Sequence, residues 1–307
     1  MNIASIGLIG YGEVGKIFTS GLIGKAGVHS VSAWDLKFAT PTLQEVQMSE
    51  RLHASSRGVQ AQDSLQALSI ASDLIIGAVT ASNALSVAQE VAKFIRPGGF
   101  YLDLNSASPG TKQKCAALID AAGGIYVEAG VMTSVPPYGI RVPMLLGGAR
   151  AADLAWQLSK WGMDAKPVSD RLGVASAIKM SRSVMIKGLE ALVIESYTTA
   201  RAYGVEDHVL PTLKETFPSI DWSLQGAYFF SRVVQHGKRR SEEMHEAANM
   251  VKESGFEPLM ASATALKQQW ISQQAQKGVF NGLAADATWQ DYADRLLAQC
   301  GNVNPKD

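Results

Sequence analysis

The sequence predicts an α/β protein in which a doubly wound, mostly parallel sheet is followed by an all-α region. Short apolar strand-like runs alternate with helical stretches up to about residue 168. Beyond that point the chain is rich in helix formers, and its helical stretches are separated by glycine or proline. A chain of 307 residues is long enough for two domains. We therefore expect one domain over 1–168 and a helical domain over 169–307, beginning with a long helix at 176–203.

The strands of the first domain follow one another along the chain. A strand at 3–9 leads into a glycine-rich turn, and further elements follow it. Strands are expected at 31–34, 74–79, 100–104, 125–129 and 142–146, and helices at 16–25, 84–94 and 110–122. The polar segment 40–56 has helical character, but the sequence does not indicate where it lies in the fold. This alternation predicts right-handed crossovers with helices on both faces of the sheet.

The second domain is predicted to be a succession of helices. They are expected at 223–236, 241–254, 258–274 and 288–300, with a loose tail at 302–307. Gly237 is expected to end one helix and Ser241 to cap the next. The basic residues at this boundary are His236, Lys238, Arg239 and Arg240. A helix boundary is the favoured interpretation of this cluster, and contact with an anionic substrate is the alternative.

Composition narrows the classes of partner and compartment. Lys and Arg number 28, as do Asp and Glu, so net charge does not indicate nucleic acid or an anionic membrane. We expect a small-molecule partner, no membrane span and a cytoplasmic location. Cys115 and Cys300 lie far apart without a C-x-x-C pair, which indicates buried or incidental thiols. The five histidines show no metal-ligand spacing, so no metal site is expected.

A dinucleotide-binding turn is predicted directly after the first strand. Gly10, Gly12 and Gly15 have the spacing G-x-G-x-x-G. The first would permit the tight turn, the second would let the backbone approach a pyrophosphate, and the third would let the helix pack on the strand. The helix N-terminus would supply free N–H groups to the phosphates. The pattern predicts a Rossmann-type cofactor site that also includes the intervening residues Tyr11, Glu13 and Val14.

The second strand is followed by an acidic residue, Asp35, at the place where a carboxylate would accept a hydrogen bond from the ribose 2′-hydroxyl. A carboxylate there favours NAD, because it would repel the 2′-phosphate of NADP. Lys37 tempers this preference, since its ammonium group could partly accept that phosphate. We therefore expect NAD to be preferred and NADP to be possible. Val79, Thr80 and Asn105 complete the predicted cofactor site.

Asn105 and Ser106 follow the strand at 100–104, at the carboxyl edge of the sheet where doubly wound folds bind ligands. Their amide and hydroxyl groups could hold a substrate carboxylate. A helix-capping loop is the alternative interpretation, because Ser108 before Pro109 is a favourable N-cap arrangement. The two interpretations are compatible.

Three motifs resemble those of the β-hydroxyacid dehydrogenases and 6-phosphogluconate dehydrogenase. The stretch 7–15 is similar to the cofactor fingerprint of that family, 103–109 to its substrate motif D-x-S-T-x-x-P, and 173–179 to its catalytic motif G-x-G-x-x-x-K. The stretches 187–192 and 236–244 resemble a less studied branch of the family. That branch pairs the NAD-binding domain with its own C-terminal helical domain.

The resemblance implies that Lys179 is the catalytic acid/base. Oxidation of a secondary alcohol needs a group that takes the hydroxyl proton, and lysine suits this task because burial readily lowers a lysine's pKa. Spacing alone would instead favour a lysine on a helix surface. The resemblance also places Thr133 and Ser134 near the substrate, where the family has V-S-G-G.

The catalytic motif departs from the family pattern at two positions. Ala175 replaces its second glycine, and Ser183 stands where the family has asparagine. Ser183 would therefore face the reacting carbon, which puts the substrate in doubt. Arg182 beside it could meet an anionic group or lie on the helix surface.

Together these features predict an NAD(P)-dependent dehydrogenase that oxidises a β-hydroxy acid, a small anionic 3-hydroxy carboxylate, to the oxo acid. An imine reductase is one alternative, against which the retained Lys179 counts. A non-catalytic NAD(P)-binding regulatory protein is the other. We expect a homodimer formed through the helical domain.

Overall fold

The computed structural model describes residues 3–39 and 44–299. The expectations for Cys300 and for the tail at 302–307 lie outside the described residues. The described chain separates into two compact units, the first ending at Met180 and the second beginning at Ser181. The boundary falls inside one long helix, so the first turns of that helix belong with the sheet.

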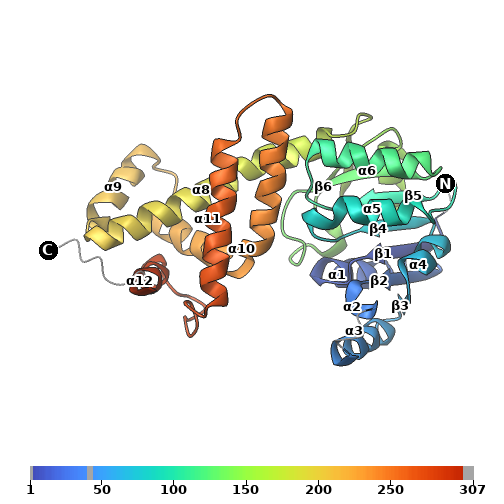
Figure 1. Ribbon diagram of the computed structural model, residues 1–307, viewed down its shortest axis with the longest axis horizontal. Helices are drawn as coiled ribbons and strands as arrows, with labels where there is room; N and C mark the ends of the chain where they lie inside the picture. The colour runs from blue at the N-terminus through green and yellow to red at the C-terminus, as the bar shows by residue number, and fades with distance from the viewer. Residues whose placement is uncertain (1–2, 40–43, 300–307) are drawn as a thin grey trace. The chain divides into compact units, whose positions relative to one another are not determined.

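The first unit is built on an eight-stranded sheet (Figure 1). Its strands are β1 (Ser5–Ile9), β2 (Ser30–Trp34), β3 (Gln60–Ala61), β4 (Leu74–Gly77), β5 (Phe100–Asp103), β6 (Ile125–Val131), β7 (Met144–Gly147) and β8 (Ala165–Ser169). They lie in the order β3-β2-β1-β4-β5-β6-β7-β8. The β6–β7 pair is antiparallel and the other pairs are parallel. This confirms the predicted doubly wound, mostly parallel sheet.

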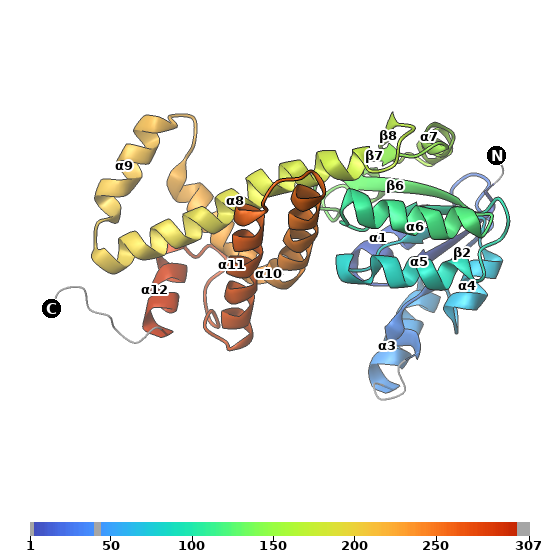
Figure 2. The same cartoon turned by 45° about the horizontal axis from the view of Figure 1, so that its top comes forward.

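Helices lie on both faces of the sheet. They are α1 (Glu13–Leu22), α2 (Leu36–Ala39), α3 (Gln44–Ser56), α4 (Leu65–Ala71), α5 (Ala84–Ala92), α6 (Pro109–Ala121) and α7 (Ala151–Lys160), with 3-10 turns η2 (Ala81–Asn83) and η3 (Gly139–Arg141). Helix α1 begins at Glu13, inside the G-x-G-x-x-G stretch, and not at residue 16 as expected. Helices α5 and α6 lie side by side on one face (Figures 1 and 2).

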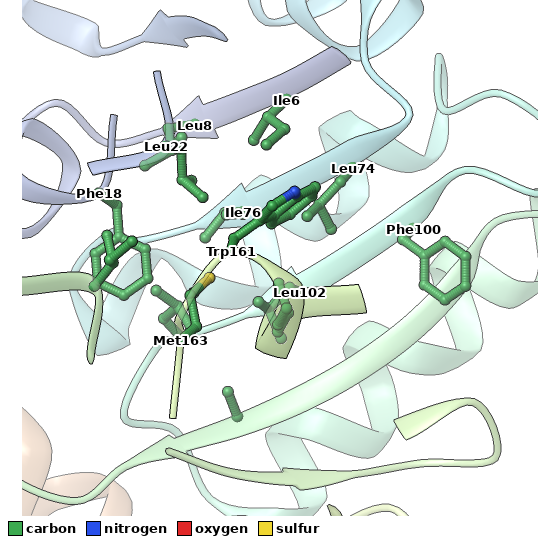
Figure 3. Close-up of a cluster of buried hydrophobic side chains, with 14 of the residues drawn as sticks. Ile6, Leu8, Phe18, Leu22, Leu74, Ile76, Phe100, Leu102, Trp161 and Met163 are labelled. Carbon is green, nitrogen blue, oxygen red and sulfur yellow. The ribbon is translucent and has the colours of Figure 1, made fainter. Parts of the chain in front are cut away.

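Strand side chains alternate between two buried clusters, as the period of two requires. On β4 and β5, Ile76 and Leu102 belong to one cluster, whereas Ile75 and Tyr101 belong to the other. Helices α1 and α7 complete the first cluster, and α4, α5 and α6 complete the second. Figure 3 shows the first cluster, which includes Trp161. The thiol of Cys115 is buried in the second, as expected.

The second unit is all-helical, as predicted. It contains the rest of α8 (Val174–Tyr203), together with α9 (Glu206–Thr216), α10 (Trp222–Glu253), α11 (Leu259–Gln276) and α12 (Trp289–Gln299). Helices α10 and α11 lie side by side in both views (Figures 1 and 2). The unit has its own core of aromatic and aliphatic side chains, in which Tyr197 packs edge-on against Trp289. Among the described helices, none combines the length and apolar character needed to cross a bilayer.

The predicted helix boundary at Gly237 and Ser241 is wrong, because α10 runs unbroken through both residues. A Cβ atom at Gly237 would lie 2.8 Å from the carbonyl oxygen of Gln268 and 3.1 Å from Cβ of Ser272. The glycine therefore allows the close approach of α11 and does not end a helix. Ser241 is buried within α10, so it is not a helix cap.

Candidate active site

The glycine-rich turn joins β1 to α1, and two of its glycines are required by the packing of the chain itself. Gly10 has φ +96°, a conformation that favours glycine, and a Cβ atom there would lie 2.4 Å from the carbonyl oxygen of Ala78. A Cβ atom on Gly15 would lie 2.0 Å from the carbonyl oxygen of Gly10. A Cβ atom on Gly12 would meet nothing within 4 Å. The open space at Gly12 fits the close approach of a cofactor pyrophosphate.

The N-terminus of α1 is also suited to phosphate. Its N-cap residue is Gly12, which has no side chain to accept a hydrogen bond from the backbone N–H groups of the first turn. Those N–H groups can therefore bind a phosphate. Glu13 is exposed in this turn, and Val14 is partly buried against the core. Tyr11 is buried, with its ring near Phe38 and its hydroxyl 3.1 Å from Nδ1 of His53. Only the backbone of Tyr11 therefore faces the turn.

Asp35 lies against the same turn. Its Oδ2 accepts a hydrogen bond of 2.6 Å from the backbone N–H of Tyr11, and its Oδ1 accepts one of 2.9 Å from the backbone N–H of Lys37. The Lys37 ammonium nitrogen is exposed and 3.9 Å from Oε1 of Glu50. The carboxylate is thus fixed beside the predicted cofactor turn, and the lysine is drawn towards another acid.

Asn105 links the ends of β4 and β5. Its Oδ1 accepts a hydrogen bond of 2.8 Å from the backbone N–H of Val79, so its Nδ2 must point elsewhere. That Nδ2 is buried and has no protein partner. A buried amide donor without a partner costs stability unless a ligand accepts from it. Thr80 is exposed, and its hydroxyl accepts from Nδ2 of Asn83.

Ser106 and Lys179 are brought together, although they are distant in sequence. The ammonium group of Lys179, on α8, donates a hydrogen bond to Oγ of Ser106, immediately beyond β5. Both residues are partly buried. Ser108 caps α6, its Oγ accepting from the backbone N–H of Thr111 at 3.2 Å. The cap of α6 and the contact between Ser106 and Lys179 therefore lie in one short segment.

Beneath this loop lies a buried polar cluster around Asp103, the first residue of the predicted substrate motif, whose partners the sequence did not predict. Oδ1 of Asp103 is 3.1 Å from the ammonium nitrogen of Lys112, and its Oδ2 accepts from the Tyr126 hydroxyl at 2.6 Å. Burial, followed by the charge of Asp103, raises the pKa of Tyr126 well above its ordinary value. Glu128 on β6 is likewise fully buried. A carboxylate inside an otherwise apolar strand is the sequence signal that could have revealed both acids.

The remaining predicted residues are not joined to this group by the contacts described. Thr133 and Ser134 are exposed in the segment after β6. Arg182 and Ser183 belong to the second compact unit, where Arg182 is exposed and Ser183 is buried. Within residues 3–39 and 44–299, no group of three or more His, Cys, Asp or Glu side chains is placed to hold a metal ion.

The second unit holds a separate buried ionic network between α8, α10 and α11. Arg240 binds Glu190 through two nitrogens, Gln268 donates to the same carboxylate, and Lys187 pairs with Glu243. Burial raises the pKa of Glu190, with Arg240 opposing the shift, and lowers the pKa of Lys187, with Glu243 opposing it. These contacts hold the three helices in register.

Comparison with known proteins identifies both parts of the chain. Residues 5–150 match the NAD binding domain of 6-phosphogluconate dehydrogenase. Residues 200–271 match the domain of unknown function DUF1932.

Solved structures resemble the whole chain. A conserved hypothetical protein from Sinorhizobium meliloti 1021 is 33% identical, with 97% of each chain covered and a TM-score of 0.75. The conserved protein MTH1747, described as structurally similar to 3-hydroxyacid dehydrogenases, is 30% identical over 89% of this chain and 99% of its own, with a TM-score of 0.66. The 3-hydroxyisobutyrate dehydrogenase of Mycobacterium tuberculosis shares the fold at 15% identity, covering 96% of this chain and 99% of its own, with a TM-score of 0.65. The chain therefore belongs to the family that joins an NAD-binding domain of the 6-phosphogluconate dehydrogenase type to a C-terminal DUF1932 domain, on a fold like that of the 3-hydroxyacid dehydrogenases.

Proposed function

We propose that the protein is an NAD(P)-dependent dehydrogenase that oxidises a small β-hydroxy acid to the corresponding oxo acid. The observation that carries the proposal is the hydrogen bond from Lys179 to Ser106 at the carboxyl edge of the sheet. Doubly wound folds bind their ligands at this edge. An amine held there beside a hydroxyl is suited to exchange a proton with a substrate hydroxyl group.

The residues described above supply distinct parts of such a site. The turn at Gly10, Gly12 and Gly15 and the N-terminus of α1 would hold the pyrophosphate, and Asp35 would hold the adenosine ribose. A bound nicotinamide supplies hydride transfer. Lys179 takes the proton from the substrate hydroxyl oxygen during oxidation and returns it during reduction.

The substrate would be held by its carboxylate. The Nδ2 group of Asn105 is buried and lacks a protein acceptor, and the hydroxyl of Ser106 lies beside it in sequence. Both can donate to a carboxylate oxygen. Thr133 and Ser134, which are exposed in the sheet unit, are proposed to contact the rest of the substrate. The substrate roles of Arg182 and Ser183 stay predictions.

The cofactor is proposed to be NAD in preference to NADP. The fixed carboxylate of Asp35 supports this preference, because it would repel a 2′-phosphate. Lys37 is exposed and close enough in sequence to permit some use of NADP.

Turnover tests the proposal. Reduced-nicotinamide absorbance is measured for a panel of small β-hydroxy acids with NAD and with NADP, for the natural protein and for Lys179→Ala. Lys166→Ala, which removes an exposed lysine, is the matched control. We expect turnover that Lys179→Ala lowers at least about 100-fold and Lys166→Ala leaves unchanged.

Other outcomes select the alternatives. Reduction of cyclic imines without oxidation of any hydroxy acid would indicate an imine reductase. Binding of NADH without turnover of any panel member would indicate a regulatory protein.

The protein is also proposed to form a homodimer through its helical unit. On α8, Met185 and Leu192 are exposed seven positions apart and so lie on one helix face. On α11, Leu259 and Leu266 repeat this spacing. Exposed apolar faces of this kind are typical of subunit interfaces.

The dimer is tested by light scattering with size-exclusion chromatography, which should give the mass of a dimer for the natural protein. The double variant Met185→Glu, Leu192→Glu should have the mass of a monomer. A monomeric natural protein would contradict the proposal.

A further inference from the structure

We propose that Glu128 is a positioning residue for Lys179. Its carboxylate, carried by β6, binds the N-terminus of α8 and holds that helix where Lys179 reaches Ser106. The inference rests on the proposed function, in which Lys179 moves the proton. Glu128 itself is buried behind the helix and acts only through it.

Both oxygens of the Glu128 carboxylate are occupied by the start of α8. Oε1 accepts hydrogen bonds from the backbone N–H groups of Gly173 at 2.7 Å and Ala175 at 3.1 Å, and Oε2 accepts one from Oγ of Ser176 at 2.7 Å. The first turn of α8 contains no acidic residue of its own. A strand residue therefore provides both the capping acceptor and the negative charge that a helix N-terminus favours.

Three glycines allow β6, β7 and the start of α8 to approach one another closely. Gly147 lies opposite Glu128 in the β6–β7 ladder, and a Cβ atom there would lie 2.4 Å from Oε1. Gly173 has φ +97°, which an L side chain rarely adopts. Larger residues at these two positions would displace the carboxylate or the turn that carries its donor.

The third glycine connects the cap to the lysine. Gly130 lies two residues beyond Glu128 on the same strand, and a Cβ atom there would be 2.9 Å from the carbonyl oxygen of Ala175 and 3.4 Å from Cβ of Lys179. Strand β6 thus holds α8 at its first turn and again at the base of the Lys179 side chain. Loss of the Glu128 bonds would loosen that first turn and move the ammonium group away from Ser106.

The test measures the position of Lys179 without any substrate. The full-length protein is treated with N-acetoxysuccinimide under native conditions, and the acetylation rate of each lysine is measured by peptide mass spectrometry. The variant Glu128→Gln keeps the size of the side chain but removes its charge and one acceptor oxygen. We expect the Lys179 rate to rise about fivefold or more relative to exposed Lys166, while buried Lys112 stays protected.

A matched variant separates positioning from general loss of stability. Asp221→Asn likewise removes a negative charge and one acceptor oxygen from a helix N-terminus, that of α10, where Oδ1 of Asp221 accepts from the backbone N–H of Leu224 at 3.0 Å. It should leave the Lys179 rate unchanged. An unchanged Lys179 rate in Glu128→Gln, or an equal rise in Asp221→Asn, would overturn the proposal. A parallel rise at Lys112 would also overturn it, because it would report opening of the whole sheet unit.

A milder variant covers the case in which Glu128→Gln does not fold. Ser176→Ala removes the contact with Oε2 and the longer hydrogen bond of 3.2 Å from the same Oγ to the carbonyl oxygen of Gly173, but it keeps both backbone bonds to Oε1. It should raise the Lys179 rate in the same direction by a smaller factor; no change in that variant would overturn the proposal. Absence of turnover in every variant would count against the proposed function alone. Where turnover is found, Glu128→Gln should lower kcat and leave the KM for NAD unchanged.

Discussion

The side-chain oxygen of Asn105 accepts a hydrogen bond of 2.8 Å from the backbone N–H of Val79, and this bond determines which way the amide points. An N–H group can only donate, so the Asn105 oxygen must face Val79 and the NH₂ group must face away. The bond also joins the loop after β5 to the end of β4. One side chain thereby links the predicted cofactor strand to the predicted substrate loop.

Replacement of Asn105 by Asp should weaken substrate binding while preserving the fold. The new side chain keeps an oxygen for Val79 but places a second oxygen where the donor was, which would repel a substrate carboxylate. We expect the KM for the hydroxy acid to rise at least about tenfold. Asn105→Ala, in contrast, leaves the Val79 N–H without its partner and should lower the free energy of unfolding by about 1–3 kcal/mol. An unchanged KM in Asn105→Asp would show that the amide does not contact the substrate.

Replacement of Asp35 by Asn should relax the choice of cofactor. The amide oxygen can still accept from the Tyr11 N–H, but the negative charge facing a 2′-phosphate is lost. We expect the ratio of kcat/KM for NAD to that for NADP to fall at least about tenfold, since like-charge contacts are costly. Asp63→Asn, at an acid with an exposed side chain, is the control. Equal ratios in Asp35→Asn and the natural protein would refute the assigned role.

Two glycines in the helical unit should respond oppositely to alanine. At Gly237 the added Cβ atom would meet a backbone oxygen at 2.8 Å, so we expect Gly237→Ala to lower the free energy of unfolding by about 1–3 kcal/mol. At Gly188 the nearest atom would be Oγ1 of Thr264 at 3.8 Å, an ordinary contact. Alanine there should stabilise helix α8 by about 0.5–1 kcal/mol. Urea denaturation measures both, and stabilisation by Gly237→Ala would contradict the packing described for α10 and α11.

Asp73 should contribute to the acid sensitivity of the sheet unit. Burial alone would raise its pKa, but hydrogen bonds from Ser5 and from the backbone of Ala4, together with Arg96, lower the pKa below its ordinary value of 3.8. Its contribution is therefore complete above the unfolded pKa and is lost as the pH falls through the lower folded pKa. We expect the free energy of unfolding to fall less steeply below about pH 4 in Asp73→Asn than in the natural protein. Identical slopes in chemical denaturation at pH 2 to 5 would contradict this prediction.

Local patterns in the sequence were sufficient for much of the fold and for the cofactor turn. The continuous apolar runs of β4 and β5 predict strands buried on both faces, and the spacing of Gly10, Gly12 and Gly15 predicts a turn whose steric demands are local. Pro109 after Ser108 similarly predicts the start of α6, because proline suits the first turn of a helix. Each of these signals depends on neighbours within a few residues.

Tertiary structure decided the features that depend on contacts between distant segments. Gly237 lies inside one helix, because close packing against α11 outweighs the weak helix propensity of glycine. The bond between Lys179 and Ser106, and the capping of α8 by Glu128, each join residues far apart in the chain. Sequence spacing and the family resemblance predicted that Lys179, Ser106 and Asn105 are site residues. Only the packing of β4, β5, β6 and α8 set their partners, because a side chain's contacts across a sheet depend on strand order and register, which no local pattern encodes.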